Sequence, residues 1–172
     1  MASFLNPEKV FNELELQENM TAADFGCGAG GWAIPLAKRL KEGRVYAIDI
    51  LEEPLSALKS KMETEKILNI EPIYSNIEKL NGSTLPDSYV DLVLITNLLF
   101  QAEDKKRILA EAKRILKNQG IMLIVDWKTG ISVGPENKIS QQEIQNLANE
   151  LDFKFKKEFS AGAYHYCLIF IK

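Results

Sequence analysis

The stretch that decides the fold reads Ala-Asp-Phe-Gly-Cys-Gly-Ala-Gly-Gly at residues 23–31. Asp24 closes a short apolar segment, and four glycines follow it within six positions. Because glycine has no Cβ and tolerates positive φ, such a loop can turn sharply and bring its main chain against a flat or charged molecule. Apolar residues at helical spacing follow from Trp32 to Leu40, so the loop leads into a helix N-terminus with exposed N–H groups. The pattern predicts a nucleotide-like cofactor above the loop.

The glycine spacing fits two kinds of cofactor site. Gly26, Gly28 and Gly31 satisfy the pattern G-x-G-x-x-G, and Asp49 lies 23 residues beyond Gly26. That is near the position of the ribose-binding acid in nicotinamide-binding folds. Asp24 argues against a nicotinamide dinucleotide, because a carboxylate there would repel the diphosphate of that cofactor. The same carboxylate suits a cofactor that carries positive charge.

The order of the remaining motifs resembles that of the class I S-adenosylmethionine-dependent methyltransferases, and the likeness covers most of the chain. The motifs stand at Asp24 to Gly30, Val45 to Ile50, Ser75 to Glu78, Val90 to Leu99 and Leu116 to Asp126. The resemblance implies S-adenosylmethionine as the cofactor. It implies cofactor contacts at Asp24, Phe25, Gly26, Cys27, Gly28, Gly30, Asp49, Ile50, Asn76, Ile77, Thr96 and Asn97.

Two of these residues also have a plain structural interpretation. The resemblance implies that the Asp49 carboxylate accepts hydrogen bonds from both ribose hydroxyls. Asp49 could instead be a solvated acid at the end of a strand. Asn76 occupies the adenine-binding turn, where the family often has Asp. Its amide oxygen can still accept from the adenine amino group, yet asparagine favours turns without any ligand.

The implied fold is α/β: a three-layer, Rossmann-like, seven-stranded mixed sheet with an antiparallel last strand, as a single domain over residues 1–172. Aliphatic runs and turn signals predict strands over Thr21–Phe25, Arg44–Asp49, Glu71–Asn76, Tyr89–Thr96 and Ile121–Trp127, and a hairpin of Phe153–Phe159 with Tyr164–Ile171. Helical spacing and caps predict helices over Pro7–Leu14, Glu53–Leu68, Glu103–Leu116 and from Ser140 to Leu151. Gly120 is expected to stop the third of these helices.

Catalytic and acceptor-binding residues are sought where parallel strands end, because ligands of open α/β sheets bind there. Asp126 and His165 are the candidate catalytic residues. Lys128, Tyr164 and His165 are the candidate substrate contacts. Each also has a structural interpretation, as a charge at a strand end or as a histidine packed among tyrosines. The segments Lys128–Ile139 and Ser160–Tyr166, with the residues before Met20, are expected to determine acceptor specificity.

Composition is that of an ordinary globular chain, with 46% apolar and 26% charged residues. A net charge of −3 gives no electrostatic footprint for nucleic acid. No apolar run approaches the roughly 20 residues of a membrane span, so we expect no membrane partner and a cytoplasmic location. Two cysteines and one histidine make no recognisable metal site. The oligomeric state stays open.

Absent motifs narrow the acceptor. The sequence after the fourth strand, Thr96-Asn97-Leu98-Leu99, lacks the Pro-Pro-aromatic motif of adenine amino-methyltransferases, and no Pro-Cys nucleophile of the cytosine enzymes is present. Two thiols are too few for an arsenite enzyme. A small-molecule acceptor, as in the quinone-type methyltransferases, is the expectation. A cofactor-binding scaffold domain without activity and a nicotinamide-dependent oxidoreductase remain as alternatives.

Overall fold

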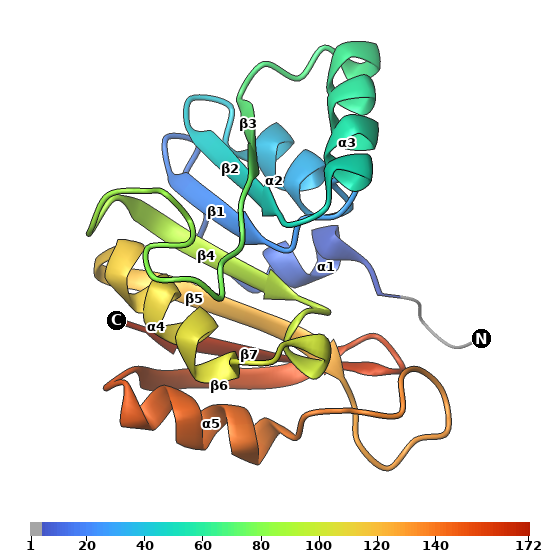
Figure 1. The fold of residues 1–172 in the computed structure, drawn as a ribbon, viewed down its shortest axis with the longest axis vertical. Helices are drawn as coiled ribbons and strands as arrows, with labels where there is room; N and C mark the ends of the chain where they lie inside the picture. Colours follow the sequence, from blue (N-terminus) through green and yellow to red (C-terminus); the bar gives the residue numbers. More distant parts are fainter. Residues whose placement is uncertain (1–4) are drawn as a thin grey trace.

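Seven strands form one sheet, in the order β3-β2-β1-β4-β5-β7-β6, in the computed structural model, which describes residues 5–172 (Figure 1). The strands are β1 Thr21–Phe25, β2 Arg44–Asp49, β3 Ile70–Tyr74, β4 Val90–Thr96, β5 Leu116–Trp127, β6 Lys154–Ala161 and β7 His165–Ile171. The helices are α1 Pro7–Phe11, α2 Ala33–Arg39, α3 Glu52–Glu65, α4 Lys105–Ile115 and α5 Gln141–Glu150, with a 3₁₀ turn, η1, at Leu99–Gln101.

The strand directions confirm the predicted mixed sheet. β3, β2, β1, β4 and β5 pair in parallel, whereas β7 runs antiparallel to both of its neighbours, β5 and β6. β7 is therefore the one reversed strand, and β6 runs in the direction of the parallel strands. The chain order turns back between β1 and β4, and such a switch point opens a crevice at the carboxyl ends of the strands.

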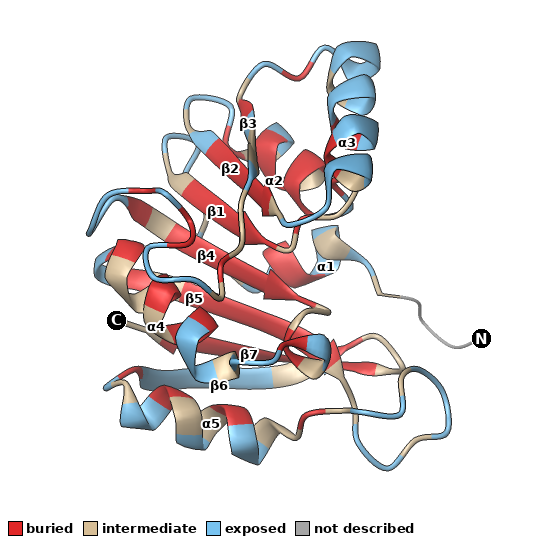
Figure 2. Cartoon of the chain, in the orientation of Figure 1, coloured by how far each residue is buried: buried red, intermediate tan, exposed pale blue. Residues whose placement is uncertain are grey.

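Helices cover both faces of the sheet and bury its central strands (Figure 2). α1, α2 and α3 share one apolar cluster with inward residues of β1, β2, β4 and β5, and α4 and α5 share a second cluster on the other face. Cover on both faces is why β4 reads Val-Asp-Leu-Val-Leu-Ile-Thr without polar alternation. β6, at the edge of the sheet, is mostly exposed.

The helix starts follow the sequence signals more closely than the ends do. Asn6 caps α1 by accepting a hydrogen bond from the Glu8 N–H at 2.9 Å, but the helix ends at Phe11 rather than Leu14. α3 ends at Glu65 rather than Leu68, because the next residue, Lys66, adopts a left-handed conformation with φ of 56°. β3 begins and ends earlier than predicted, so Asn76 lies in the turn after it.

The segment from Leu116 to Gly120 corrects the sequence prediction. We expected a helix end followed by a glycine turn, but β5 already begins at Leu116, which is buried and pairs with Val90. The register shifts between Val90 and Leu92, so the first part of β5 is offset from the rest. Lys172 supplies backbone hydrogen bonds to this stretch: the Gln119 N–H donates to the Lys172 carbonyl at 3.3 Å, and the Lys172 N–H donates to the Gly120 carbonyl at 3.0 Å. A local sequence pattern does not reveal such bonds.

Among the helices of residues 5–172, none combines the length and apolar composition needed to cross a bilayer.

Candidate functional site

A hollow of about 360 Å³ lies at the carboxyl ends of β1, β2 and β3 and against η1. Of the residues predicted to bind a cofactor, six line it: Gly26, Gly28, Asp49, Ile50, Asn76 and Ile77. The structure thus brings together residues from three separate motifs. The other predicted residues lie beneath the hollow or at the neighbouring strand end.

The glycine loop has the backbone shape that its sequence predicts. Gly26, Gly28 and Gly30 have φ of 69°, 53° and 84°, values that other residues rarely adopt. A Cβ on Gly30 would come within 2.5 Å of the Leu58 side chain, whereas a Cβ on Gly28 would meet nothing within 4 Å. The loop is therefore packed against α3 on one side and open toward the hollow at Gly28.

Asp49 connects the loop to the end of β2. Its Oδ2 accepts from the Gly28 N–H at 2.8 Å, and its Oδ1 accepts from the Leu51 N–H at 3.0 Å. Each carboxylate oxygen can accept more than one hydrogen bond, so both retain capacity toward the hollow. Asp49 thus fixes the loop and can still bind a ligand hydroxyl.

Asp24 is the least expected feature of the site. Its side chain is fully buried, and neither carboxyl oxygen has a hydrogen-bond partner within residues 5–172. Burial, together with the charge of Asp49, raises the pKa of Asp24 to about 8, and the nearby Ala33 amide, which is outside hydrogen-bonding geometry, offsets this rise in part. A buried polar group without a partner is costly, so it points to a group that the protein binds there.

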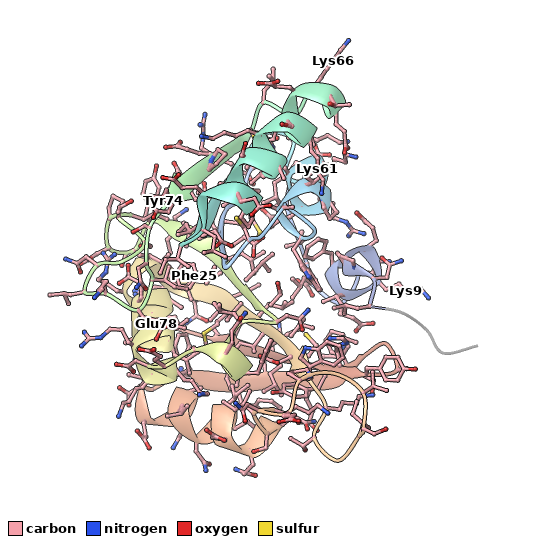
Figure 3. The ribbon with its side chains drawn as sticks, turned by 45° about the vertical axis from the view of Figure 1, so that its right-hand side comes forward. Lys9, Phe25, Lys61, Lys66, Tyr74 and Glu78 are labelled. Carbon is pink, nitrogen blue, oxygen red and sulfur yellow. The ribbon has the colours of Figure 1, made fainter. Side chains whose placement is uncertain are left out.

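The residues on either side of the loop's first glycine belong to the interior. Phe25, labelled in Figure 3, is fully buried and belongs to the apolar cluster on the α4 and α5 side of the sheet. Cys27 is also buried, and burial raises the pKa of its thiol. Neither side chain lines the hollow, so any cofactor contact they make would come from the main chain.

The Asn76 side chain forms a hydrogen bond within the turn after β3, as expected from the structural alternative to cofactor binding. Its Oδ1 accepts from the Glu78 N–H at 2.8 Å, which closes the turn after β3. The next residue, Ile77, is buried below the turn. An adenine amino group could donate to the Asn76 Oδ1, as predicted, only if this oxygen also accepts from the Glu78 N–H.

Thr96 ends β4, and Asn97 follows it directly before Leu98, which lines the hollow. Thr96 is buried, and Asn97 adopts φ of 51° while its N–H donates to the Val125 carbonyl at 2.8 Å. The Asn97 Oδ1 is buried without a hydrogen-bond partner in the described part of the chain. A second unpartnered acceptor therefore lies at the strand beside Asp24.

Sequence reasoning missed part of the hollow's wall. Leu51, Leu98, Gln101 and Ala102 line it as well. Ile50 and Leu51 are 52% and 59% exposed, and because both line the hollow they are suited to covering a flat ring. The sequence places these residues shortly after strand ends, but this position alone does not identify lining residues, because the core residue Leu99 also has it.

Asp126 is buried at the end of β5 on the α4 side. Its Oδ2 accepts from the Phe100 N–H at 3.3 Å and its Oδ1 from the Trp127 N–H at 2.8 Å. Burial raises its pKa to about 6, and these amides limit the rise. In this arrangement Asp126 anchors η1 to the sheet.

His165 packs against Trp127, with ring centroids 4.1 Å apart. Its Nε2 is buried and has no partner among the described residues, and burial lowers its pKa. The loop after β5 covers the indole from another direction, since a Cβ on Gly134 would lie 2.4 Å from the Trp127 ring. His165 is therefore a largely enclosed, neutral imidazole.

Lys128 and Tyr164 differ from their predicted setting. The Lys128 Nζ donates to the carbonyls of Gly162 and Ala163, at 3.3 and 3.2 Å, so it ties β5 to the turn between β6 and β7. Tyr164 lies in that turn, and the final strand begins only at His165. The turn's carbonyls hold the ammonium that was predicted to contact substrate.

Comparison with known proteins identifies the family and the fold. A family model described as a methyltransferase domain matches residues 16–166. The chain belongs to the methyltransferase-domain family. The demethylmenaquinone methyltransferase of Geobacillus stearothermophilus is 30% identical to it over 118 residues, which cover 68% of this chain and 49% of the relative. The chain thus spans about half the length of the curated relatives it matches.

Solved structures of methyltransferases have the same architecture. An S-adenosylmethionine-dependent methyltransferase from Aquifex aeolicus superposes with a TM-score of 0.88 at 29% identity, covering 97% of this chain and 89% of that one. The 4+2 cyclase SpnF superposes with a TM-score of 0.82 at 13% identity, covering 96% and 79%. The second likeness concerns the fold alone. The family's cofactor is S-adenosylmethionine, as the sequence predicted.

Proposed function

We propose that this methyltransferase domain binds S-adenosylmethionine and transfers its methyl group to a small-molecule acceptor. The observation that carries the proposal is the unpartnered carboxyl of Asp24, buried under a glycine loop that Asp49 braces. A cationic cofactor explains why a carboxyl is kept there, because a positive group can replace the proton that Asp24 holds, whereas a diphosphate offers the buried carboxyl no positive partner.

The residues fit the cofactor group by group. Asp24 would receive the ammonium group directly or through water, and Asp49 would accept from the ribose hydroxyls. Ile50, Leu51 and the turn at Asn76 would enclose the adenine. Thr96 and Asn97 would lie toward the methyl end. When bound, S-adenosylmethionine supplies a methyl group activated by its attachment to a sulfonium.

The protein's part in such a transfer is mainly alignment. Holding two reactants in line can contribute up to about 7 to 11 kcal/mol in favourable models. His165, neutral and close to the carboxyl edge, is the candidate for accepting a proton from an acceptor that must lose one. Asp126 is the weaker candidate, because main-chain amides already occupy both of its oxygens.

The acceptor class is inferred from the relatives. Those with curated names act on demethylmenaquinone, which supports a ring-containing small molecule for this chain. The proposal treats residues 1–172 as one methyltransferase domain, and the cytoplasmic location remains a prediction from the sequence. The fold alone does not determine the reaction, since SpnF, which has the same fold, is named as a 4+2 cyclase.

Calorimetric titration with S-adenosylhomocysteine and NADH tests the choice of cofactor. We expect S-adenosylhomocysteine to bind at least about tenfold more tightly, because its ammonium group can pair with Asp24, whereas the Asp49 carboxylate opposes the NADH diphosphate. Tighter binding of NADH in the same buffer would assign the protein to the oxidoreductases. Binding of S-adenosylhomocysteine without any transfer of labelled methyl to a cell extract would favour the scaffold alternative.

A further inference from the structure

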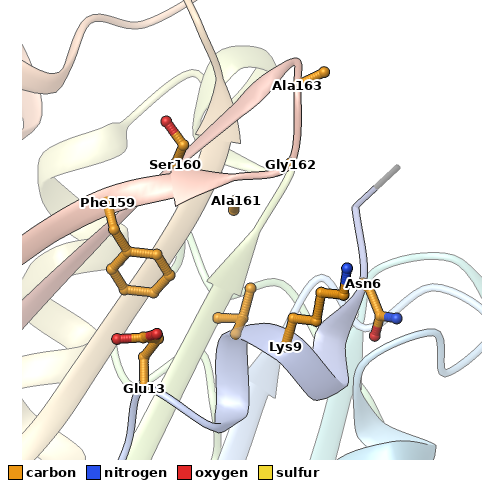
Figure 4. A pocket seen from close by; sticks show the side chains of 9 residues that line it. Asn6, Lys9, Glu13, Phe159, Ser160, Ala161, Gly162 and Ala163 are labelled. Atoms are coloured by element: carbon orange, nitrogen blue, oxygen red, sulfur yellow. The ribbon is translucent and has the colours of Figure 1, made fainter. Parts of the chain in front are cut away.

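A second and larger hollow, of about 430 Å³, lies between α1 and the turn that joins β6 to β7 (Figure 4). We call it the α1–hairpin pocket; it is lined by Asn6, Lys9, Val10, Glu13 and residues 159–163. In Figures 1 and 4 the arrowhead of β4 ends between these two elements. The pocket thus lies beside the end of β4, while the cofactor hollow lies at the ends of β1, β2 and β3.

Both walls of the pocket are attached to the cofactor edge of the sheet. On one side, Phe11 of α1 packs edge-on against Trp32, with ring centroids 5.6 Å apart, and Trp32 directly follows the glycine loop. On the other side, Ala161 pairs with His165, whose ring packs at a tilt of 42° against Trp127 at the end of β5. The two walls of the pocket are therefore in contact with the residue that follows the glycine loop and with the end of β5.

The interior of the pocket is apolar and includes an aromatic ring. Val10 and Ala161 contribute buried aliphatic groups, and the Ala161 methyl lies in the middle of the view in Figure 4. The ring of Phe159 forms a side wall. A volume of about 430 Å³ falls in the range of roughly 300 to 1,000 Å³ that small-molecule sites occupy. These walls suit a flat ring system.

The charge balance at the pocket favours an anion. Glu13, its one acidic residue, forms an ion pair with Lys157, whose ammonium also lies 5.3 Å from the Phe159 ring centroid. Lys9 forms no ion pair within residues 5–172. The Asn6 oxygen is used in capping α1, which leaves its amide N–H groups as donors. An ammonium and amide donors thus stand beside an apolar interior.

We infer that the α1–hairpin pocket binds an aromatic carboxylic acid carrying a hydroxyl, and that this compound is the methyl acceptor. The inference rests on the proposed function and names its substrate class. The carboxylate lies toward Lys9 and Asn6, and the ring lies against Phe159 and Val10. The acceptor's hydroxyl oxygen forms a bond to the methyl carbon as the bond from that carbon to sulfur breaks. Sulfur keeps the electron pair, and the hydroxyl proton passes to the imidazole of His165, the proton acceptor proposed above, and from there to water.

Fluorescence titration with 1-hydroxy-2-naphthoate and with its methyl ester tests the pocket, in the presence and absence of saturating S-adenosylhomocysteine. We expect the acid to bind at least about fivefold more tightly than the ester. Lys9→Gln should weaken binding of the acid about three- to fivefold, as befits an exposed ion pair, and Lys9→Glu more than about tenfold. Ala161→Leu should abolish binding of both compounds by filling the pocket.

Lys59→Gln, on the exposed side of α3, is the matched control and should bind both compounds as the wild type does. All variants should keep wild-type affinity for S-adenosylhomocysteine, which shows that they are folded. Equal binding of acid and ester, no binding of the acid to the wild type, or an unchanged affinity in Lys9→Glu would each overturn the inference. Failure of the wild type to bind S-adenosylhomocysteine would instead overturn the proposed function, because titration without it still reports on the pocket.

Discussion

Replacing Asp49 by alanine is expected to weaken S-adenosylhomocysteine binding by roughly 30- to 700-fold, corresponding to about 2 to 4 kcal/mol. Two effects combine. The variant loses the charged acceptor for the ribose hydroxyls, and the Gly28 and Leu51 N–H groups lose their partner, so the loop is no longer braced. Calorimetric titration measures the change.

Asp49→Asn separates the two effects. Its amide oxygen can still accept from the Gly28 N–H, but the charge is gone, so we expect a smaller loss than for alanine. Circular dichroism and urea unfolding establish that both variants are folded. If folded Asp49→Ala binds within twofold of the wild type, Asp49 is only a strand-end acid and the ribose assignment is wrong.

Replacing Asp24 by asparagine is expected to flatten the pH dependence of stability while weakening cofactor binding. The pKa of Asp24 is about 8 in the folded protein and 3.8 for an ordinary aspartate. The folded state therefore holds this proton to higher pH than the unfolded state does. Its contribution to stability is complete below about pH 4 and is lost as the pH rises toward about 8.

Between pH 5 and pH 7.5 the wild type should lose roughly 2 to 4 kcal/mol more unfolding free energy than Asp24→Asn, from about 1.4 kcal/mol per pH unit for one proton. Urea unfolding without cofactor measures the difference, and groups common to both proteins, such as Asp126, cancel. Asp91→Asn is the matched control: Asp91 accepts from the Thr21 N–H and pairs with Lys117, so its loss should only destabilise. Parallel pH profiles for wild type and Asp24→Asn would show that the buried carboxyl does not hold its proton.

The sequence predicted best what local chemistry determines. The bounds of β1 and β2 agree with the structure because each strand is a short apolar run that ends in a defined acid or glycine turn. The start of β5 was missed because the polar segment after Leu116 forms its backbone hydrogen bonds with Lys172, a residue far away in the sequence. Hydrogen bonds between distant residues leave no local hydrophobic pattern in the sequence from which the strand could be predicted.

The candidate site divides in the same way. The motif spacing predicted that Gly26, Gly28 and Asp49 lie close together, because parallel strands end at the same edge of the sheet. In the structure these three residues line one hollow. The spacing could not show that the Asn76 oxygen is turned back on its own loop, or that Lys128 is held by the hairpin turn. The α1–hairpin pocket joins residues 6–13 to residues 159–163, a contact made only by the folded chain.

Amide NMR titration of the isotope-labelled protein with S-adenosylhomocysteine tests the central claim most directly. We expect the largest shifts at residues 26–30, 49–51, 75–78 and 96–98, with the Gly28 amide foremost because it faces the hollow and bonds Asp49. Saturable shifts confined to these segments would place the cofactor at the carboxyl ends of β1, β2, β3 and β4. Shifts centred elsewhere, or no saturable shift at millimolar ligand, would contradict the account.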